Sequence, residues 1–588
     1  EVGVFDPAGA VAASTDTLES KALVLESTVE VVAPTKTALE TTDVVEVTAS
    51  PALVDGCTIP GVARYQAIAG VPYALAIDDV KKRFLVGATA EVAEVLPPVP
   101  ITVNDHYYPA AASIAGAGGT RWATQVVAWN RGAATGADGA ALSTVANLLL
   151  MPTDWILGNT PAATMTVPPG KIVSWADPIS QEMKSADVAG ALRIAPPSAT
   201  TTNFGDFFSW VRVYRTREDG GTYGMARNRV LGTEAVASGE TGVVFAPPDG
   251  AAQRTNAGLF VVESTVVTVS VVQEDGTLRG GPVTFDWPAG YHAQVSTVFD
   301  AFGPPPIPSA RSVFSVASGR VLPFGTSIDV ASGDPIDLPF FGPRSSAAVQ
   351  WLLGVERGGG PLGPTSRTDL QLYNPGTSDA TVTLGFRAGR LSTEASSPAD
   401  PPFATLTVPA GRGLTVRDAV KGLFGLEVAA GSVDVVSDPP VHVFARVTAE
   451  DASGGRHGYG ISAVLGNAGP VSGGRGVFIQ AADAGFDVME SELQVTNPTD
   501  APANVTVKAW DFEGTAAGTP LALTLGPKEV VRIPAAFYNI SGIGAPVGRL
   551  EVLPTDCAGT VFAVYVRQDR KTGDADAVVP YVIAPPSS

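Results

Sequence analysis

The sequence predicts an all-β protein: a tandem array of about four two-layer β-sandwich modules, each with one short helix, preceded by an extended N-terminal segment. Three observations carry this prediction. Stretches of alternating polar and apolar residues, typical of half-buried strands, run along most of the chain. The 64 Gly and 48 Pro residues supply turns between them. A short motif also recurs, as TMTVPPGK (164–171), TFDWPAGY (284–291), TLTVPAGR (405–412) and TLGPKEV (524–530).

The recurring motif has a nearly constant spacing. Its anchor residues Gly170, Gly290, Gly411 and Lys528 are 120, 121 and 117 residues apart, and such a period is the signature of a repeat protein. An apolar stripe at helical spacing follows the anchors and predicts one short helix per copy. The stripe consists of Val295, Val298, Phe299 and Phe302 in the second copy, Val416, Ala419, Val420 and Leu423 in the third, Ile533, Ala536, Phe537 and Ile540 in the fourth, and only Trp175 and Ile179 in the first.

The N-terminal region differs from the repeats. Residues 1–56 contain two β-prone stretches, 22–32 and 44–49, with no hairpin turn between them. We therefore expect an extended leader that can donate a strand to another sheet. Residues 57–103 form a transition, with one helix expected around 77–85 and a stiff Pro-rich joint at 96–100.

The repeats divide the remaining chain into four expected modules: 104–230, 231–343, 344–466 and 467–588. About 120 residues of short antiparallel strands are enough for a two-layer sandwich. A strand near the end of three modules carries an arginine, at Arg212, Arg446 or Arg567. We interpret these arginines as solvated residues at a sheet edge.

Several segments resemble repeats found in large secreted bacterial proteins. They are NPGTSDATVTL (374–384), TLTVPAGRGLTVRDAVKGLFG (405–425), VHVFARV (441–447) and SGRVLPFGTSIDVASGDPIDLP (318–339). The resemblance covers roughly residues 110–588, and the first copy departs most, with an insertion around 132–143. It implies immunoglobulin-like β-sandwich modules and an exported location, and it implies no activity.

Charge and hydropathy exclude some classes of partner. The formal net charge is −20, so there is no basic field to displace counterions from nucleic acid, and none to attract anionic lipid. No apolar run approaches the roughly 20 residues of a membrane-spanning helix. The chain begins with Glu1 and not Met, which we interpret as an exported protein whose signal peptide has been removed.

No residue pattern predicts catalysis or a cofactor. The four histidines are scattered, and no nucleophile motif is present. A GxGxxG match at 358–363 is followed by Pro364 and a strand, where a dinucleotide site needs a helix, so we interpret it as a loop. We expect no enzyme activity.

Three weaker candidate sites remain. The carboxylates Asp569, Asp574 and Asp576 lie in one hairpin and are weak calcium candidates, with a plain polar hairpin tip as the favoured alternative.

The cysteines Cys57 and Cys557 are disulfide candidates, within one chain or between chains, with buried free thiols as the alternative. The aromatic residues Tyr107 and Tyr108 could bind a sugar or a partner at the surface, whereas packing at a strand start is the alternative.

The sequence thus favours an exported structural or adhesive surface protein, a subunit of an extracellular filament, sheath or layer. Its expected partners are further copies of itself or another surface protein, joined by strand addition and module contacts. The alternative is a noncatalytic array that binds a glycan or a protein within a larger cell-surface complex.

Overall fold

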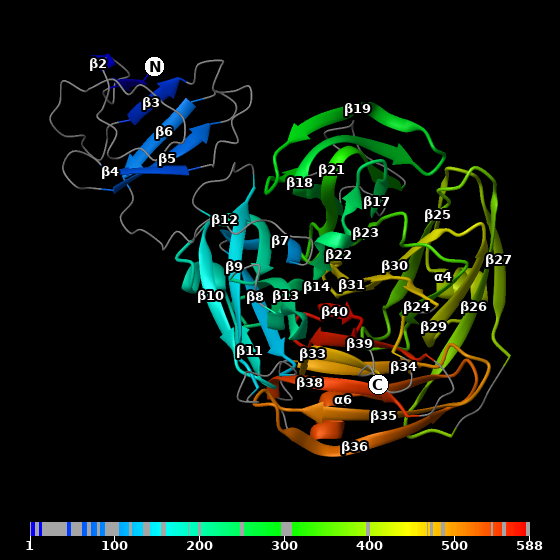
Figure 1. Ribbon diagram of the computed structural model, residues 1–588. Coiled ribbons are helices and arrows are strands. Elements are labelled where there is room, and N and C mark those ends of the chain that lie inside the picture. Colours follow the sequence, from blue (N-terminus) through cyan, green and yellow to red (C-terminus); the bar gives the residue numbers. More distant parts are fainter. Residues whose placement is uncertain are drawn as a thin grey trace.

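The structure is a computed structural model of the 588-residue chain. It describes residues 105–583 with short gaps and, before them, the backbone of six strands only. The gaps are 117–119, 133–140, 154–159, 186, 198–201, 247–251, 296–308, 396–399, 467, 471–473, 484–488, 543–544 and 556–559. Figure 1 gives the course of the chain and the labels of its elements.

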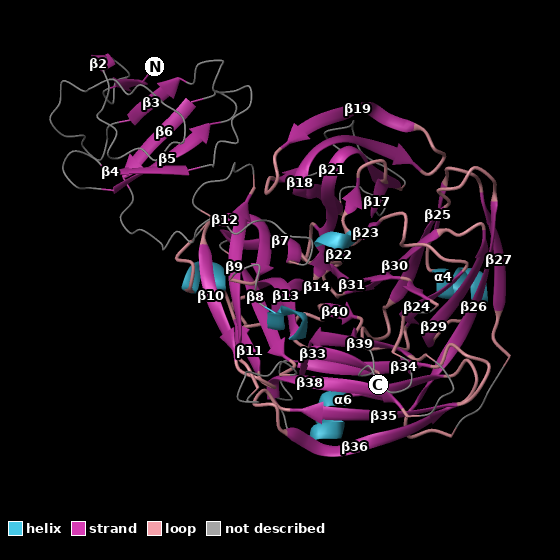
Figure 2. Ribbon diagram, in the orientation of Figure 1, coloured by secondary structure: helices cyan, strands magenta, loops and turns pink. Residues whose placement is uncertain are grey.

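The described part of the chain is all-β with a few short helices, as the sequence predicts (Figure 2). The helices are α2 (Pro178–Gln181), α4 (Ala419–Phe424), α6 (Ala536–Ser541) and the 3-10 turns η2 (Thr202–Asp206) and η3 (Gly232–Glu234). Helices α2, α4 and α6 follow the first, third and fourth copies of the motif and bury Ile179, Val420 and Phe537. In the second copy, Val298, Phe299 and Phe302 lie outside the described residues.

The N-terminal strands form an antiparallel sheet in the order β2-β1-β3-β6-β5-β4. Their bounds are β1 (Val2–Phe5), β2 (Val11–Ser14), β3 (Val44–Thr48), β4 (Val62–Gln66), β5 (Pro72–Asp78) and β6 (Arg83–Ala88).

This sheet corrects two predictions. Strands β1, β2 and β3 pair with each other and with β6 of the same chain, so this part of the leader is not an unpaired strand donor; the stretch 22–32 lies outside the described residues. The helix expected around 77–85 is wrong. Alternation of Tyr73, Leu75 and Ile77 has the period of a strand, and β5 pairs with β6 instead.

The rest of the chain forms four stretches, called units 1 to 4 (residues 106–231, 236–341, 349–465 and 475–583). Unit 1 has the strands β7 (His106–Ala115), β8 (Arg121–Asn130), β9 (Thr144–Pro152), β10 (Ala162–Val167), β11 (Ile172–Trp175), β12 (Val188–Ala195), β13 (Phe207–Thr216), β14 (Thr222–Asn228) and β15 (Val230–Leu231). Unit 2 has β16 (Val236–Ala237), β17 (Thr241–Ala246), β18 (Gln253–Gln273), β19 (Leu278–Trp287), β20 (His292–Val295), β21 (Ala310–Asp329), β22 (Pro335–Leu338) and β23 (Phe340–Phe341).

Units 3 and 4 complete the chain. Unit 3 has β24 (Val349–Arg357), β25 (Arg367–Tyr373), β26 (Ala380–Leu391), β27 (Phe403–Val408), β28 (Gly413–Val416), β29 (Ala429–Asp438), β30 (His442–Glu450), β31 (Arg456–Ser462) and β32 (Val464–Leu465). Unit 4 has β33 (Arg475–Asp483), β34 (Met489–Thr496), β35 (Ala503–Trp510), β36 (Ala516–Leu525), β37 (Val530–Pro534), β38 (Ala545–Pro554), β39 (Phe562–Asp569), β40 (Ala575–Val578) and β41 (Tyr581–Ile583).

The same order of paired strands is found in all four units. One set of pairs runs β10-β9-β12-β7-β15, β19-β18-β21-β17-β23, β27-β26-β29-β24-β32 and β36-β35-β38-β33-β41. The other runs β11-β8-β13-β14, β20-β18-β21-β22, β28-β25-β30-β31 and β37-β34-β39-β40. Side chains from both sets meet in one buried cluster within a unit, as in unit 3. The sequence repeat is therefore a repeat of strand pairing.

The anchor residues of the motif explain its spacing. Gly170, Gly290, Gly411 and Lys528 all have a positive φ, between 55° and 85°. Glycine adopts this left-handed conformation without a steric cost. Each anchor turns the chain out of strand β10, β19, β27 or β36 and toward the strand that precedes the helix position.

Unit 2 differs from its neighbours around residues 263–264. Strand β18 continues through this point with a shift of register. In units 1, 3 and 4 a buried asparagine ends the corresponding strand, and its side-chain amide donates to the backbone carbonyls of Val167, Val408 and Gly526. These residues are Asn130, Asn374 and Asn497.

The four units close into a ring (Figure 1). Strands β14, β22, β31 and β40, one from each unit, pack against one another around its centre. Unit 4 also packs on unit 1: Trp129, Phe208 and Trp210 share one buried cluster with Phe478 and Val495. Units 1 and 4 therefore share part of their buried core.

Candidate functional site

The centre of the ring contains two turns with the same sequence pattern. They are Asp329-Val-Ala-Ser-Gly-Asp334 in unit 2 and Asp569-Arg-Lys-Thr-Gly-Asp574 in unit 4. In each, the Ser or Thr backbone N–H donates to the first aspartate side chain, at 2.7 and 3.2 Å, and its hydroxyl accepts from the N–H of the last aspartate. The turns place Asp334 and Asp574 at the start of the central strands β22 and β40.

Asp574 is buried and surrounded by donors from unit 1. Its Oδ2 accepts from Nη2 of Arg212 at 2.9 Å and from the backbone N–H of Gly224 at 2.8 Å. The same guanidinium donates through Nε to Asp576 at 2.7 Å. Arg567 also donates to Asp576. One arginine of unit 1 thus holds two carboxylates of unit 4.

Asp334 has an equivalent backbone partner, but no ion pair with it is found in the described part of the chain. Its Oδ2 accepts from the N–H of Gly458 of unit 3 at 3.0 Å, as Asp574 does from Gly224 of unit 1. The carboxyl groups of Asp334 and Asp574 interact across the centre of the ring, and Oδ1 of each has no other hydrogen-bond partner among the described residues. Burial, followed by the charge of Asp574, raises the pKa of Asp334 well above its usual value. Asp334 is therefore the proton donor of the pair.

The pKa of Asp574 is raised to about 7, chiefly by burial, although Arg212 opposes that shift. Two carboxylates so close cannot both ionise in a buried site, so the pair shares one proton.

This geometry corrects the calcium prediction. The candidates Asp569, Asp574 and Asp576 lie on a buried hairpin, not at a solvated tip, because unit 1 covers it. Their oxygens accept from Arg212, Arg567, Thr222 and Gly224. Among the described residues, no group of three or more acidic, histidine or cysteine side chains could hold a metal ion.

The solvated environment predicted for the arginines of β13, β30 and β39 is also wrong. Arg212, Arg446 and Arg567 are 4–7% exposed and not solvated. Along β13, Arg212 alternates with Val211 and Val213, which pack in the core of unit 1, so it lies on the opposite face. A neighbouring unit covers that face, however, and an isolated module gives no sign of this.

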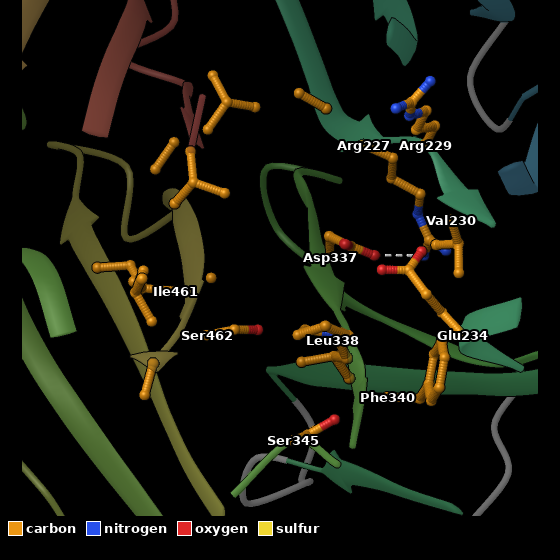
Figure 3. Close-up of a pocket in the computed structure, with 18 of the residues that line it drawn as sticks. Arg227, Arg229, Val230, Glu234, Asp337, Leu338, Phe340, Ser345, Ile461 and Ser462 are labelled. Atoms are coloured by element: carbon orange, nitrogen blue, oxygen red, sulfur yellow. Dashed lines mark ion pairs between the residues drawn. The ribbon is translucent and has the colours of Figure 1, made fainter. Parts of the chain in front are cut away.

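A cavity of about 810 Å³ lies beside this polar centre, around the same axis (Figure 3). It is lined by β14, β22, β31 and β40 and by the last strand of each unit, β15, β23, β32 and β41. Its wall is mostly apolar. Figure 3 shows one charged side, where Arg227 forms an ion pair with Asp337 and Glu234 lies nearby.

The tyrosines predicted to bind at the surface do not reach it. Tyr107 and Tyr108 are fully buried on β7. Tyr108 donates to Ser209 at 2.8 Å, and Tyr107 donates to Asp105. Burial raises the pKa of Tyr107. The prediction of surface-binding aromatics is therefore wrong: strand β12 pairs with β7, and the ring of Phe260 of unit 2 lies tilted against Tyr107, with the ring centroids 5.4 Å apart.

Both disulfide candidates, Cys57 and Cys557, lie outside the described residues. The four histidines remain separate and buried within the described chain: His106, His292, His442 and His457. Burial lowers the pKa of His292 and of His442 to about 4, so both are neutral at pH 7. None of the described helices is long and apolar enough to span a membrane.

The sequence offered only a weak signal for this site. The D-x-x-S/T-G-D pattern occurs twice, at 329–334 and 569–574, and could have indicated two equivalent turns. In comparisons with known proteins, no protein-family model matches the chain and no curated protein sequence matches it.

Proposed function

We propose that this protein is an exported, noncatalytic structural protein, a building block of an extracellular filament, sheath or layer. In this proposal the four units are immunoglobulin-like β-sandwich modules. The low charge density, the repeat and the resemblance to secreted bacterial repeats support the exported location. The closed ring adds a rigid shape, because the first and last units are bound to each other.

The observation that carries the proposal is the junction of units 1 and 4. Arg212 is separated by 362 residues from Asp574, yet the two are paired and buried. The aromatic side chains of unit 1 that pack against unit 4 add an apolar contact around this pair. A chain closed in this way resists extension, which suits a block that carries load between neighbouring copies.

The outer edges of the sheets are the proposed assembly surfaces. Among the described strands, β19 pairs with β18 alone, and most of its residues are exposed. Leu278 is 54% exposed and Val283 is 42% exposed. An edge with unpaired backbone groups and exposed apolar side chains can accept a strand from another molecule.

Electron microscopy and sedimentation velocity over a range of concentrations test this function. We expect regular polymers of the full chain, and we expect Val283→Lys to weaken them. The matched control is Val436→Lys, which changes a valine of similar exposure on the interior strand β29. A wild-type protein that remains monomeric at every concentration would contradict the proposal.

Two further measurements locate the assembly contact. Deletion of residues 1–56 removes β1–β3, and polymers that persist without them would show that assembly does not need these three strands. Non-reducing electrophoresis of the polymers shows whether Cys57 and Cys557 link neighbouring chains.

The alternative function is a noncatalytic array that binds a glycan or a protein. The residues predicted to make that contact are not at the surface. Tyr107 and Tyr108 are buried, so a sugar cannot stack on them. We therefore favour the structural role.

A further inference from the structure

The axial cavity retains apolar surface that the chain itself does not cover. The last strand of each unit contributes one half-buried or exposed side chain to its lining, and these are Val230, Phe340, Val464 and Val582. Figure 3 also shows Leu338 of β22 and Ile461 of β31 among the side chains around this space. Apolar surface left in a concave site with a volume of about 810 Å³ is typical of a ligand pocket, whose usual range is about 300–1,000 Å³.

The charged side chains of the lining nearly balance one another, as three arginines and four acidic residues. Two of them are buried, Arg227 at 7% exposed and Asp576 at 4%. Arg227 forms an ion pair with Asp337 (Figure 3). Asp576 accepts from Arg212 at 2.7 Å and from Arg567 at 3.2 Å. The buried charges of this lining therefore already have counterions within the protein.

The other four charged side chains of the lining are half-buried or exposed, and each bonds to a nearby backbone group. Arg229 donates to the carbonyl of Phe207 and Arg344 to that of Thr233, and Glu234 and Glu240 accept from the N–H groups of Leu231 and Ala237. An ion pair with these exposed groups is screened by solvent and contributes little. A charged ligand would thus lose its hydration without gaining a buried partner, which is unfavourable.

We infer that the axial cavity binds an uncharged, largely apolar small molecule. The ligand lies between the last strands of the four units, against Val230, Phe340, Val464 and Val582. Removing this surface and the ligand from water supplies the affinity, and the matched charges of the lining select against an ionic group. This binding site goes beyond the proposed structural role and does not depend on it.

Fluorescence titration of the full chain tests the inference with two probes that share one ring system. The uncharged probe is N-phenylnaphthylamine, and the anionic probe is anilinonaphthalenesulfonate. We expect one saturable site for the uncharged probe and at least tenfold weaker binding of the sulfonate. Absence of a saturable site would overturn the inference, and so would binding of the sulfonate with equal or higher affinity.

Displacement of N-phenylnaphthylamine tests the other sign of charge. Decanol should displace this probe at a concentration at least tenfold lower than decyltrimethylammonium does. The lining has one acidic residue more than it has arginines. Equal or better displacement by the ammonium compound would therefore mean that the cavity selects a cation, and it would overturn the uncharged class.

Variants place the site in the cavity. Ser462 and Ala577 both line it and are half-buried, so Ser462→Trp and Ala577→Trp should fill part of the volume. Each should weaken binding of N-phenylnaphthylamine at least tenfold. The matched control is Ser378→Trp, in an exposed loop outside the cavity, and it should bind like the wild type.

Circular dichroism shows which variants are folded, and two cavity variants on different units guard against a folding failure. Folded cavity variants that bind N-phenylnaphthylamine like the wild type would overturn the assignment. Loss of binding in the control as well would overturn it too.

Discussion

The central turns of units 2 and 4 are alike in sequence and in backbone hydrogen bonds, but their last aspartates differ in charge state. Asp574 accepts from Arg212, whereas the groups that face Asp334 among the described residues are the N–H of Gly458 and the carboxyl group of Asp574. A repeat therefore reproduces the backbone geometry, while one side chain from a neighbouring unit decides which carboxyl keeps its proton. The following predictions test this difference, from the largest expected effect to the smallest.

Replacing Arg212 should have the largest effect. Arg212→Met leaves Asp574 and Asp576 buried without their main cation, and loss of one partner of a buried ion pair costs about 3–5 kcal/mol. Urea denaturation monitored by tryptophan fluorescence measures the change in the free energy of unfolding. A loss below about 1 kcal/mol would show that the junction of units 1 and 4 does not depend on this arginine.

The two aspartates should respond differently to the same substitution. Asp574→Asn removes a charged acceptor from Arg212 and should cost about 2 kcal/mol. In Asp334→Asn the amide can still donate to Asp574 and its oxygen can still accept from Gly458, so we expect a change below about 0.5 kcal/mol at pH 7. Equal losses in urea denaturation would mean that Asp334 and Asp574 are equivalent.

The shared proton should make stability depend on pH. The folded-state pKa values of Asp334 and Asp574 are raised above 3.8, the latter to about 7. The folded state therefore holds a proton that the unfolded state has lost, and stability decreases as pH rises through the folded-state pKa. The groups around this pair are unchanged between the wild type and the Asp334→Asn variant, which are compared below. They are Tyr223, Arg212, Asp576 and His457.

Between pH 6 and 8 we expect the wild type to lose about 1 kcal/mol more than Asp334→Asn, since one proton is worth about 1.36 kcal/mol per pH unit. Glu356, whose pKa burial raises to about 8, contributes the same slope to both proteins and cancels in the comparison. Parallel pH profiles of the two proteins would rule out a proton shared through Asp334.

The smallest effect belongs to an exposed ion pair at the same junction. Lys171 pairs with Glu513 of unit 4, and both side chains are more than 40% exposed. Lys171→Ala should change the free energy of unfolding by about 0.5 kcal/mol or less, because solvent screens an exposed pair. A loss comparable to that of Arg212→Met would mean that burial is not what distinguishes the two pairs.

Local features of the fold could be predicted from the sequence. The positive φ at Gly170, Gly290 and Gly411 follows from glycine at a recurring turn, and the helices α4 and α6 follow from apolar residues at helical spacing. These features depend on neighbours a few residues apart. The helix expected around 77–85 failed for a related reason: a short apolar stretch fits either period, and pairing with a partner strand decided the outcome.

The candidate site could not be predicted in the same way. Tyr107 and Arg212 lie where a single unit would expose them or leave them at an edge, and contacts with other units bury them. Tyr108 packs in the core of unit 1 itself. The cavity likewise has walls from all four units. Its existence depends on the angle between units, which no segment of the sequence specifies alone.

The sequence by itself determined the strands, the turns and the period of the repeat, because each depends on the conformational preferences of residues close together in the chain. Only the tertiary structure decided that four units close on themselves. Closure brings Arg212 to Asp574 across 362 residues, and it removes both from water. Burial then turns an arginine and an aspartate that would be solvated in one unit into the contact that joins the first unit to the last.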